Sequence, residues 1–261
     1  MGIDEPIYRV HDLVRIFSHG PQPVTAVDHV DFEIPAGQRL GIVGESGSGK
    51  STLIRMMAGL RRPTGGDIVF AGRSIVGRRE PELAWLRRGV QLVFQDPRSS
   101  LDPRMKIADI IAEPLRSKIW QGTRREVAGR VDELMTQVGL EPADRNRYPH
   151  QFSGGQRQRI AIARALAPNP QVLIADEAVS ALDVSVRAQV LNLFADLVAD
   201  HGLTLIFVSH DLSVVRHMCD AVLVMQAGRI VEGGPIDGVY SDPQQPYTRR
   251  LLASIPRLRR N

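Results

Sequence analysis

The stretch GESGSGKST (44–52) decides the fold of this chain. It follows the short apolar run RLGIVG (39–44) and precedes TLIRMMAGL (52–60), so the pattern indicates a strand, a glycine-rich loop and a helix. In that setting G-x-x-x-x-G-K-[ST] predicts a loop whose backbone N–H groups surround phosphate oxygens. We expect ATP or GTP there, with Lys50 on the terminal phosphates and Ser51 on Mg²⁺. The expected nucleotide-binding positions are Gly44, Glu45, Ser46, Gly47, Ser48, Gly49, Lys50, Ser51 and Thr52.

Two acidic residues end the apolar run VLIADE (172–177), which has the pattern of a buried strand. We expect Asp176 to approach Mg²⁺ through a water, and Glu177 to polarise a water for in-line attack on the γ-phosphate. His210 and Gln95 each end a further apolar strand. Because ligands bind at the carboxyl ends of parallel strands, both are candidates to reach the nucleotide. Taken alone, a strand-end histidine is more often structural, and a strand-end glutamine is a weak signal.

A second glycine-containing stretch, FSGGQ (152–156), stands directly before RQRIAIARALA (157–167), which has a helical pattern. Small residues that open a helix form an anion site, because free backbone N–H groups and the positive end of the helix dipole point outward. Unlike the first loop, this stretch has no lysine. Its candidate binding residues are Ser153, Gly154, Gly155 and Gln156.

The composition fits an ordinary globular protein. The chain has 261 residues, enough for one large domain or for a domain with an inserted subdomain. Its hydrophobic fraction of 43% supports a sizeable core, and a net charge of +4 is ordinary surface charge. The single cysteine, Cys219, excludes a disulfide framework and a cysteine metal cluster within the chain. No apolar run approaches about 18 residues and the N-terminal residues do not form a signal peptide, so we expect no membrane span and a reducing cytoplasm.

Strand patterns fill the first third of the chain. Residues 7–18 and 25–34 alternate loosely between apolar and polar, and 66–75 carries Ala71 and Gly72 as a hairpin-like turn. We therefore expect an antiparallel β patch beside the start of a nucleotide-binding core. Strands that alternate with helices in the second half of the chain predict a parallel sheet.

A helical segment interrupts this core. TRREVAGRVDELMTQVGL (123–140) has an apolar stripe at helical spacing, with Thr123 and Glu126 as a capping box and Gly139 as its stop. The predicted fold is α/β: a P-loop NTPase core with a mainly parallel sheet, an N-terminal antiparallel β subdomain and an inserted α-helical subdomain. The expected boundaries are about 1–95 and 161–240 for the core with its antiparallel β subdomain, 96–160 for the helical subdomain, and 241–261 for a short C-terminal helical tail.

Taken together, these motifs resemble an ABC-type ATPase subunit over essentially the whole chain. The resemblance rests on the order and spacing of 44–51, Gln95, 153–156, Asp176 with Glu177, SALD (180–183) and His210. It implies ATP and Mg²⁺ as cofactors, and catalytic roles for Glu177, His210 and Gln95. It implies magnesium contacts from Ser51, Gln95 and Asp176. It also implies that Gln95 couples to a membrane partner and that the loop 180–183 lies at a subunit interface.

The same resemblance explains why the stretch 152–156 lacks a lysine. In a head-to-tail dimer, Ser153, Gly154 and Gly155 would close on the γ-phosphate that the partner's phosphate loop holds. The chain would then carry two incomplete halves of a nucleotide site.

One aromatic residue is a candidate for stacking on the adenine ring. Phe17 precedes the loop that leads to the next strand and to the phosphate loop. The alternative interpretation is a core phenylalanine, and Tyr8 is a weaker candidate for stacking.

A narrower resemblance is to the oligopeptide and dipeptide importer branch, and within it to the second of two paired ATPases. PYTRRLL (246–252) is its most branch-specific segment, although this segment also fits a helix that only packs on the core. The resemblance implies a peripheral subunit on the cytoplasmic face of the inner membrane that energises peptide uptake through a separate permease docked near 95–114. The implied partners are a second ATPase subunit in a homodimer or heterodimer, two transmembrane permease subunits and an extracytoplasmic solute-binding protein, with no nucleic acid.

Three departures from the family pattern stand out. Phe152 replaces the more common leucine, which marks a subgroup, and Ala178 with Val179 replaces Pro-Thr after the catalytic acid. Since Glu177 is intact, we expect activity to survive. Some larger members have a cysteine cluster, whereas this chain has only Cys219, which excludes an iron–sulfur site.

Two alternatives remain open at this point. The same ATPase role fits the uptake of nickel or another small solute, because the sequence does not identify the solute. A DNA-repair-type ATPase has an ATPase domain with the same motifs, but it carries a long coiled coil between the phosphate loop and the Ser-Gly-Gly motif. Here that interval of about a hundred residues has no sustained heptads.

Overall fold

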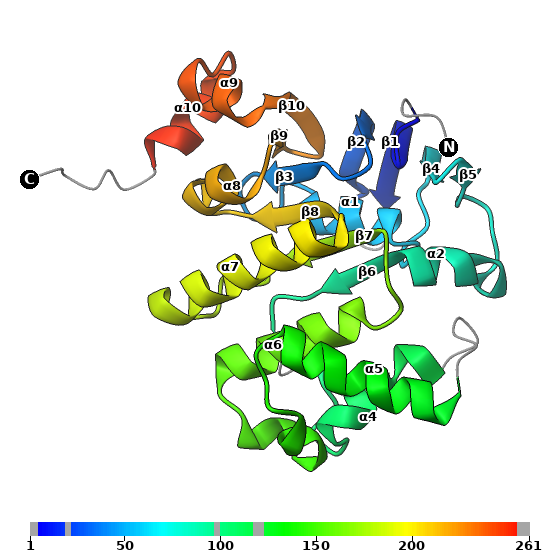
Figure 1. Ribbon diagram of the computed structural model, residues 1–261. Coiled ribbons are helices and arrows are strands. Elements are labelled where there is room, and N and C mark those ends of the chain that lie inside the picture. The colour runs from blue at the N-terminus through cyan, green and yellow to red at the C-terminus, as the bar shows by residue number, and fades with distance from the viewer. Residues whose placement is uncertain (1–4, 19–21, 97–99, 117–122, 255–261) are drawn as a thin grey trace, which may run out of the picture. The chain divides into compact units, whose positions relative to one another are not determined.

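The computed structural model describes residues 5–18, 22–96, 100–116 and 123–254 (Figure 1). The chain divides into two compact units: residues 1–78 together with 204–261, and residues 79–203. No helix in the described ranges is long and apolar enough to cross a lipid bilayer.

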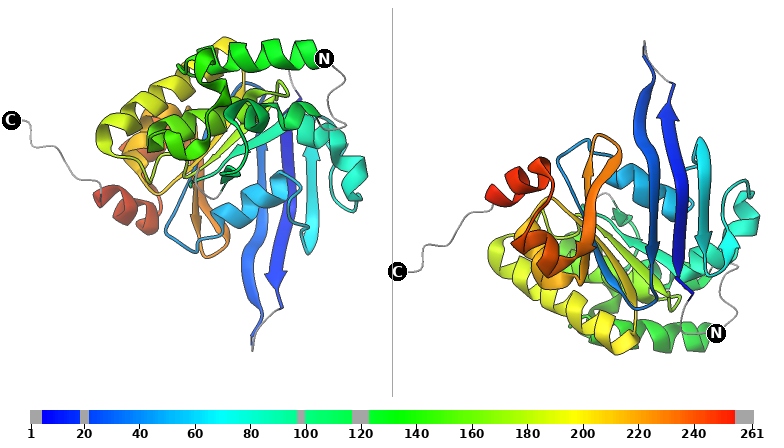
Figure 2. Two further views of the ribbon diagram at one scale, coloured as in Figure 1. Left: turned by 90° about the horizontal axis from the view of Figure 1, so that it is seen from below. Right: turned by 90° about the horizontal axis from the view of Figure 1, so that it is seen from above.

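The first unit contains a four-stranded antiparallel sheet of order β2-β1-β4-β5. Its strands are β1 (Tyr8–Phe17), β2 (Val24–Ile34), β4 (Gly65–Phe70) and β5 (Arg73–Ser74). Figure 2 shows β1 and β2 as two long strands that lie side by side. The turn between β4 and β5 consists of Ala71 and Gly72, whose φ angles are 45° and 74°. Two successive positive φ angles are typical of a type I′ hairpin turn, so the predicted antiparallel patch and its turn are confirmed.

The first unit also contains a parallel layer. β3 (Arg39–Val43) pairs in parallel with β8 (Thr204–Ser209) on one side and with β9 (Ala221–Gln226) on the other. β10 (Arg229–Pro235) then returns antiparallel to β9. The helices of this unit are α1 (Lys50–Met57), α8 (Leu212–Met218), α9 (Ile236–Ser241) and α10 (Pro246–Ala253). Every residue of β8 is buried, as a parallel strand covered on both faces requires.

The second unit begins with the short helices η1 (Glu80–Leu83) and α2 (Ala84–Gly89). Its strands β6 (Val90–Val93) and β7 (Val172–Asp176) pair in parallel, and every residue of β7 is buried. α7 (Val184–His201) follows β7 in the chain. It starts where the Asp183 carboxylate accepts a hydrogen bond from the Val186 amide at 3.0 Å, and it stops at Gly202 with φ +60°. These end signals are a side-chain N-cap and a left-handed C-cap.

The remaining helices of the second unit lie between β6 and β7 in the chain. They are α4 (Ile107–Ala112), η2 (Pro114–Arg116), α5 (Arg124–Gln137), η3 (Pro142–Asn146), η4 (Pro149–Gln151) and α6 (Gly154–Leu166). The predicted capping box of α5 is present, because Thr123 and Glu126 bond each other's amides at 2.6 and 3.3 Å. The Glu126 carboxylate accepts hydrogen bonds from the Thr123 amide and, at 2.8 Å, from the Thr123 hydroxyl, and these two bonds hold its pKa below the usual value. The predicted stop also occurs, since Gly139 has φ +69°.

The helical subdomain boundaries predicted at 96 and 160 differ from the limits of the two units. α6 continues past residue 160, and the second unit also includes β6, β7 and α7. The predicted boundaries therefore stay a prediction.

Candidate functional site

The glycine-rich loop leaves the carboxyl end of β3 and enters α1, which begins at Lys50. Gly49 has φ +106°, and a Cβ atom added there would lie 2.3 Å from the Ala26 carbonyl oxygen. Gly47 has φ +82°, but a Cβ atom there would meet nothing within 4 Å. Gly44 has φ +152°, and a Cβ atom there would lie 2.2 Å from the Met225 carbonyl oxygen. Gly44 and Gly49, but not Gly47, are therefore required by both backbone conformation and close approach of a neighbouring strand.

Lys50 folds back over the loop that precedes it. Its ammonium group donates to the carbonyl oxygens of Gly44 at 2.7 Å and Glu45 at 2.9 Å, while its side chain is almost fully buried. A buried charge needs such polar partners, because desolvation is costly. The ammonium group is thus held against the loop that leads into α1, and the first turn of a helix favours a negatively charged ligand.

His210 lies at the same sheet edge as the loop. Val43, the last residue of β3, pairs with Ser209, the last residue of β8, so Gly44 and His210 are the next residues on two neighbouring strands. The side chain of His210 is exposed. The parallel register thus brings together two parts of the predicted site within one unit.

The two aromatic candidates for adenine stacking differ in their surroundings. Phe17 is half-buried, and the guanidinium groups of Arg15 and Arg61 lie 4.7 and 4.9 Å from its ring centroid. Tyr8 is fully buried against Phe70, and its hydroxyl donates to the Met57 carbonyl at 3.0 Å. Tyr8 is therefore a core residue, whereas Phe17 is partly exposed beside two guanidinium groups.

The second unit holds the acidic part of the predicted site. Val93 of β6 pairs with Ala175 of β7, so Asp176, the last residue of β7, and Gln95, two residues after β6, lie at the same end of this strand pair. Asp176 is nearly buried, whereas Gln95 is exposed. A hydroxyl, an amide oxygen and a carboxylate are hard oxygen ligands of the kind that Mg²⁺ prefers, so Ser51, Gln95 and Asp176 fit this ion chemically.

Glu177 has an unusual backbone conformation. Its φ angle is +49°, which is a sterically costly region for a residue with a side chain. The Glu177 carbonyl oxygen accepts two hydrogen bonds from Ser180, one from the amide and one from the hydroxyl, each at 3.0 Å. These bonds hold the chain in a sharp turn directly after β7, so the direction of the Glu177 side chain is fixed by the turn.

The start of α6 carries the second glycine stretch. The Ser153 hydroxyl accepts a hydrogen bond from the Gln156 amide at 3.2 Å, and the Gln156 side-chain oxygen accepts one from the Ser153 amide at 2.9 Å. Both side chains are exposed. A Cβ atom added to Gly155 would lie 2.3 Å from Cγ1 of Val186 on α7, so only glycine fits between the two helices. The helix start is therefore covered by α7 at Gly155, while the capping-box residues Ser153 and Gln156 face solvent.

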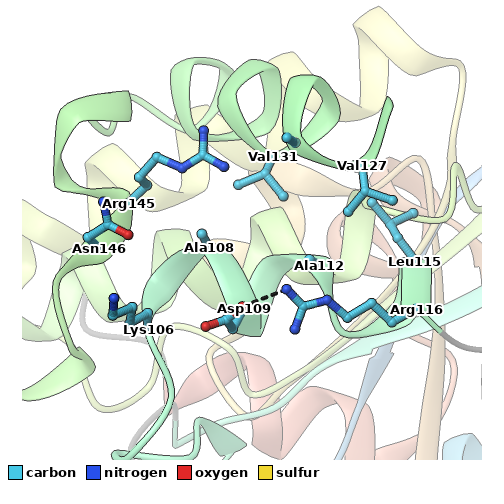
Figure 3. Close-up of a pocket in the computed structure, with 11 residues that line it drawn as sticks. Lys106, Ala108, Asp109, Ala112, Leu115, Arg116, Val127, Val131, Arg145 and Asn146 are labelled. Atoms are coloured by element: carbon cyan, nitrogen blue, oxygen red, sulfur yellow. Dashed lines mark hydrogen bonds and ion pairs between the residues drawn. The ribbon is translucent and has the colours of Figure 1, made fainter. Parts of the chain in front are cut away.

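A cavity of about 810 Å³ lies within the helical part of the second unit. Figure 3 shows Val127 and Val131 from α5 on one side and Ala108 and Ala112 from α4 on the other. Arg116 at its edge pairs with Asp109 at 2.5 Å. The cavity lining contains none of the residues predicted to bind nucleotide.

The predicted site residues thus fall into two groups, each described within its own unit. The first unit brings the loop 44–52 and His210 to the carboxyl ends of β3 and β8, and the second brings Gln95 and Asp176 with Glu177 to the carboxyl ends of β6 and β7. One contact was not predicted from the sequence, where 246–252 is a branch-specific segment that also fits a packing helix. The Glu45 amide donates to the Tyr247 phenol oxygen at 3.0 Å. The partners are 202 residues apart, so no local pattern in the sequence could reveal the contact.

Comparisons with known proteins agree with these motifs. A family model described as "ABC transporter" matches residues 27–180. A putative peptide import ATP-binding protein of Brucella abortus is 52% identical over 98% of this chain and 78% of its own length. The oligopeptide transport ATP-binding protein OppF of Escherichia coli is 49% identical over 95% of this chain and 75% of its own length. A solved dimeric ATP-binding cassette with bound ADP and phosphate is similar with a TM-score of 0.79 and 28% identity, covering 88% of this chain and 98% of that one.

Gly47 and Gly49 form a matched pair for a first prediction. Gly47→Ala should lower the free energy of unfolding by about 1–2 kcal/mol, the cost of a left-handed residue with a side chain. Gly49→Ala should cost more, because its Cβ atom would also meet the Ala26 carbonyl oxygen. Urea unfolding without nucleotide measures both values. Equal losses in the two variants would contradict the close approach at Gly49.

Proposed function

The chain belongs to the ABC transporter family, and we propose that it energises the uptake of peptides across the cytoplasmic membrane through a separate permease. Members of this family bind ATP and hydrolyse it to drive transport. The observation that carries the peptide assignment is the near-full-length similarity to ATP-binding proteins of peptide importers in two bacteria. The nucleotide chemistry is the same whichever solute is moved, so the solute needs its own test.

We propose that the loop 44–52 holds the phosphates of ATP, and that Phe17 stacks on the adenine. The position of the Lys50 ammonium group on the loop carbonyls supports this, because a phosphate at the loop amides would lie within its reach. Mg²⁺ would be held by Ser51, by Gln95 and, through a water, by Asp176. Its chemistry there is to neutralise charge on the terminal phosphates.

Glu177 is proposed as the group that orients and polarises the attacking water. Two observations support the assignment: its position directly after a buried strand, and the positive φ that the hydrogen bonds from Ser180 maintain. Strained backbone of this kind is often found at active sites. His210 is proposed to contact the γ-phosphate from the adjacent strand end, and Gln95 to sense the metal and its water.

A second ATPase subunit is proposed to complete each nucleotide site in a head-to-tail dimer. The start of α6 is a helix N-terminus with exposed cap residues Ser153 and Gln156 and without a lysine, which suits a phosphate already held by another chain. Ser153, Gly154, Gly155 and Gln156 would then contact the nucleotide of the partner. The similar cassette with ADP and phosphate was itself solved as a dimer.

The permease is proposed to dock on the helical part of the second unit, with a solute-binding protein on the far side of the membrane. The cavity between α4 and α5 supports this position, because its lining includes Lys106, Ala108 and Ala112 from the stretch 95–114. Valines and alanines beside charged residues suit the end of an amphipathic helix. The chain would therefore lie peripherally on the cytoplasmic face of the membrane.

Glu177→Gln tests the mechanism and the substrate class together. Turnover should fall by about 10²–10⁴-fold through loss of the general base, while ATP still binds and traps a closed dimer. The control is Glu141→Gln, an exposed glutamate far along the chain, which should leave turnover unchanged. ATP hydrolysis and size-exclusion chromatography measure these effects.

In vesicles that carry the assembled transporter, Glu177→Gln should also stop uptake of a labelled dipeptide. Undiminished turnover in the variant would overturn the role of Glu177. Unmutated transporter that takes up nickel but no peptide would overturn the peptide assignment alone.

Ser153→Arg tests the dimer. It removes an N-cap and adds a positive charge at the positive end of α6, so dimer closure and hydrolysis should be lost while the isolated subunit still binds ATP. Thr123→Arg makes the same change at the N-cap of α5. Both should cost about 1 kcal/mol of stability, but only the first should block the dimer. Loss of ATP binding in the isolated Ser153→Arg subunit would count against this arrangement.

Ala108→Trp tests the permease position. The larger side chain should fill part of the cavity and prevent co-purification with the permease, without changing the ATPase activity of the free subunit. Ala199→Trp, on an exposed part of α7, is the control and should still co-purify. If both variants retain the permease, the cavity does not receive it.

A further inference from the structure

The helix α10, close to the end of the described chain, contacts the phosphate loop. Tyr247 is the second residue of this helix and is only 5% exposed. Its phenol oxygen accepts a hydrogen bond from the Glu45 amide at 3.0 Å. Glu45 is the second residue of the loop, so a side chain 202 residues away binds the loop where it leaves the sheet.

This hydrogen bond acts on the same peptide group that holds the loop lysine. The peptide unit between Gly44 and Glu45 donates its N–H to Tyr247 and accepts the Lys50 ammonium group on its C=O at 2.7 Å. In a trans peptide these two groups point in opposite directions in one rigid plane. Fixing the N–H side therefore also fixes the carbonyl on which the ammonium group rests.

The start of α10 is itself firmly held. The Glu232 carboxylate on β10 accepts hydrogen bonds from the Gln244 amide at 2.7 Å and the Gln245 amide at 3.1 Å. Burial raises the pKa of Glu232, but its hydrogen bonds, including these two, outweigh burial and keep that pKa below its usual value. Pro246 then opens the helix and Thr248 is fully buried. Tyr247 is therefore fixed by the hydrogen bonds of the residues before it and by the burial of the residue after it.

A second contact joins the same C-terminal part of the chain to the loop. The Gly228 amide, in the turn between β9 and β10, donates to the Ser48 carbonyl at 2.9 Å. The Gly228 carbonyl accepts from the Asp28 amide at 2.9 Å, and Arg229 pairs with the Asp28 carboxylate at 2.6 Å. The loop backbone is thus bonded at Glu45 by α10 and at Ser48 by the β9–β10 turn.

We propose that Tyr247 is a positioning residue for ATP binding: it holds the peptide group 44–45, and through it Lys50, in the binding arrangement before nucleotide arrives. The proposal rests on the proposed role of the loop 44–52 in holding ATP. A loop that is already ordered binds ATP more tightly, because no free energy of binding is lost in ordering it. Bound phosphates then hold the loop amides themselves, so the effect belongs to binding and not to the chemical step.

Tyr247→Phe tests this role, since it keeps the ring and removes the hydrogen-bond acceptor. The affinity of the full chain for ATP should fall about threefold to tenfold, which is the range for one hydrogen bond, while kcat at saturating ATP stays the same. Tyr240→Phe is the matched control, because the Tyr240 hydroxyl donates to the Leu212 carbonyl at 2.6 Å on α8. It should lower thermal stability to a similar degree and leave the ATP affinity unchanged.

Glu232→Gln provides a second, indirect variant. It weakens the anchor of α10 without touching Tyr247, so it should reduce ATP affinity in the same direction but by less. Titration with a fluorescent ATP analogue measures affinity, and thermal melting measures stability. The proposal is overturned if Tyr247→Phe binds the analogue as tightly as the unmutated chain, or if Tyr240→Phe loses as much affinity. An unmutated chain that binds no analogue would instead overturn the proposed function of the loop.

Discussion

The parallel pairing of β3 with two neighbours is the constraint on which the first unit depends. β3 is bonded along both edges, and Ile42 and Val43 are fully buried. A strand held in this way fixes the point at which the chain leaves the sheet, and the first turn of α1 begins only a few residues later. The loop must therefore reverse direction beside β2, whose Ala26 carbonyl leaves room for glycine alone at position 49. The amide-lined loop and the folded-back lysine follow from this geometry.

Local features of the molecule could be predicted from the sequence, because each is encoded within a few residues. The capping boxes at Thr123 and Ser153 pair residues three apart. The turn at Ala71 and the helix stop at Gly139 each depend on positive φ angles of one or two neighbouring residues. The α/β fold and the shared sheet edge of the phosphate loop and His210 also follow from strand patterns, since parallel strands place their carboxyl ends together.

Contacts between distant segments could not be predicted in the same way. The hydrogen bond between Glu45 and Tyr247 depends on how α10 packs, and a pattern of apolar residues does not specify which backbone group a buried phenol meets. The same limit applies to Tyr8, whose burial against Phe70 removes it as a stacking candidate. The roles proposed for Glu177 and for the helix start at Ser153 involve bound nucleotide and a second chain, which the fold of one chain does not define.

The contact of Gly155 with Val186 has a mechanical consequence. At Gly155 the Val186 side chain of α7 packs directly on the backbone of α6, and close-packed interiors transmit displacement instead of absorbing it. α7 is in turn joined to Glu177 by a short segment that Ser180 braces through its hydrogen bonds. In a head-to-tail pair, α6, α7 and the segment back to Glu177 would therefore move as one rigid body. This body would connect Glu177, at one nucleotide, to the start of α6, at the other. The two sites of such a pair could not open and close independently.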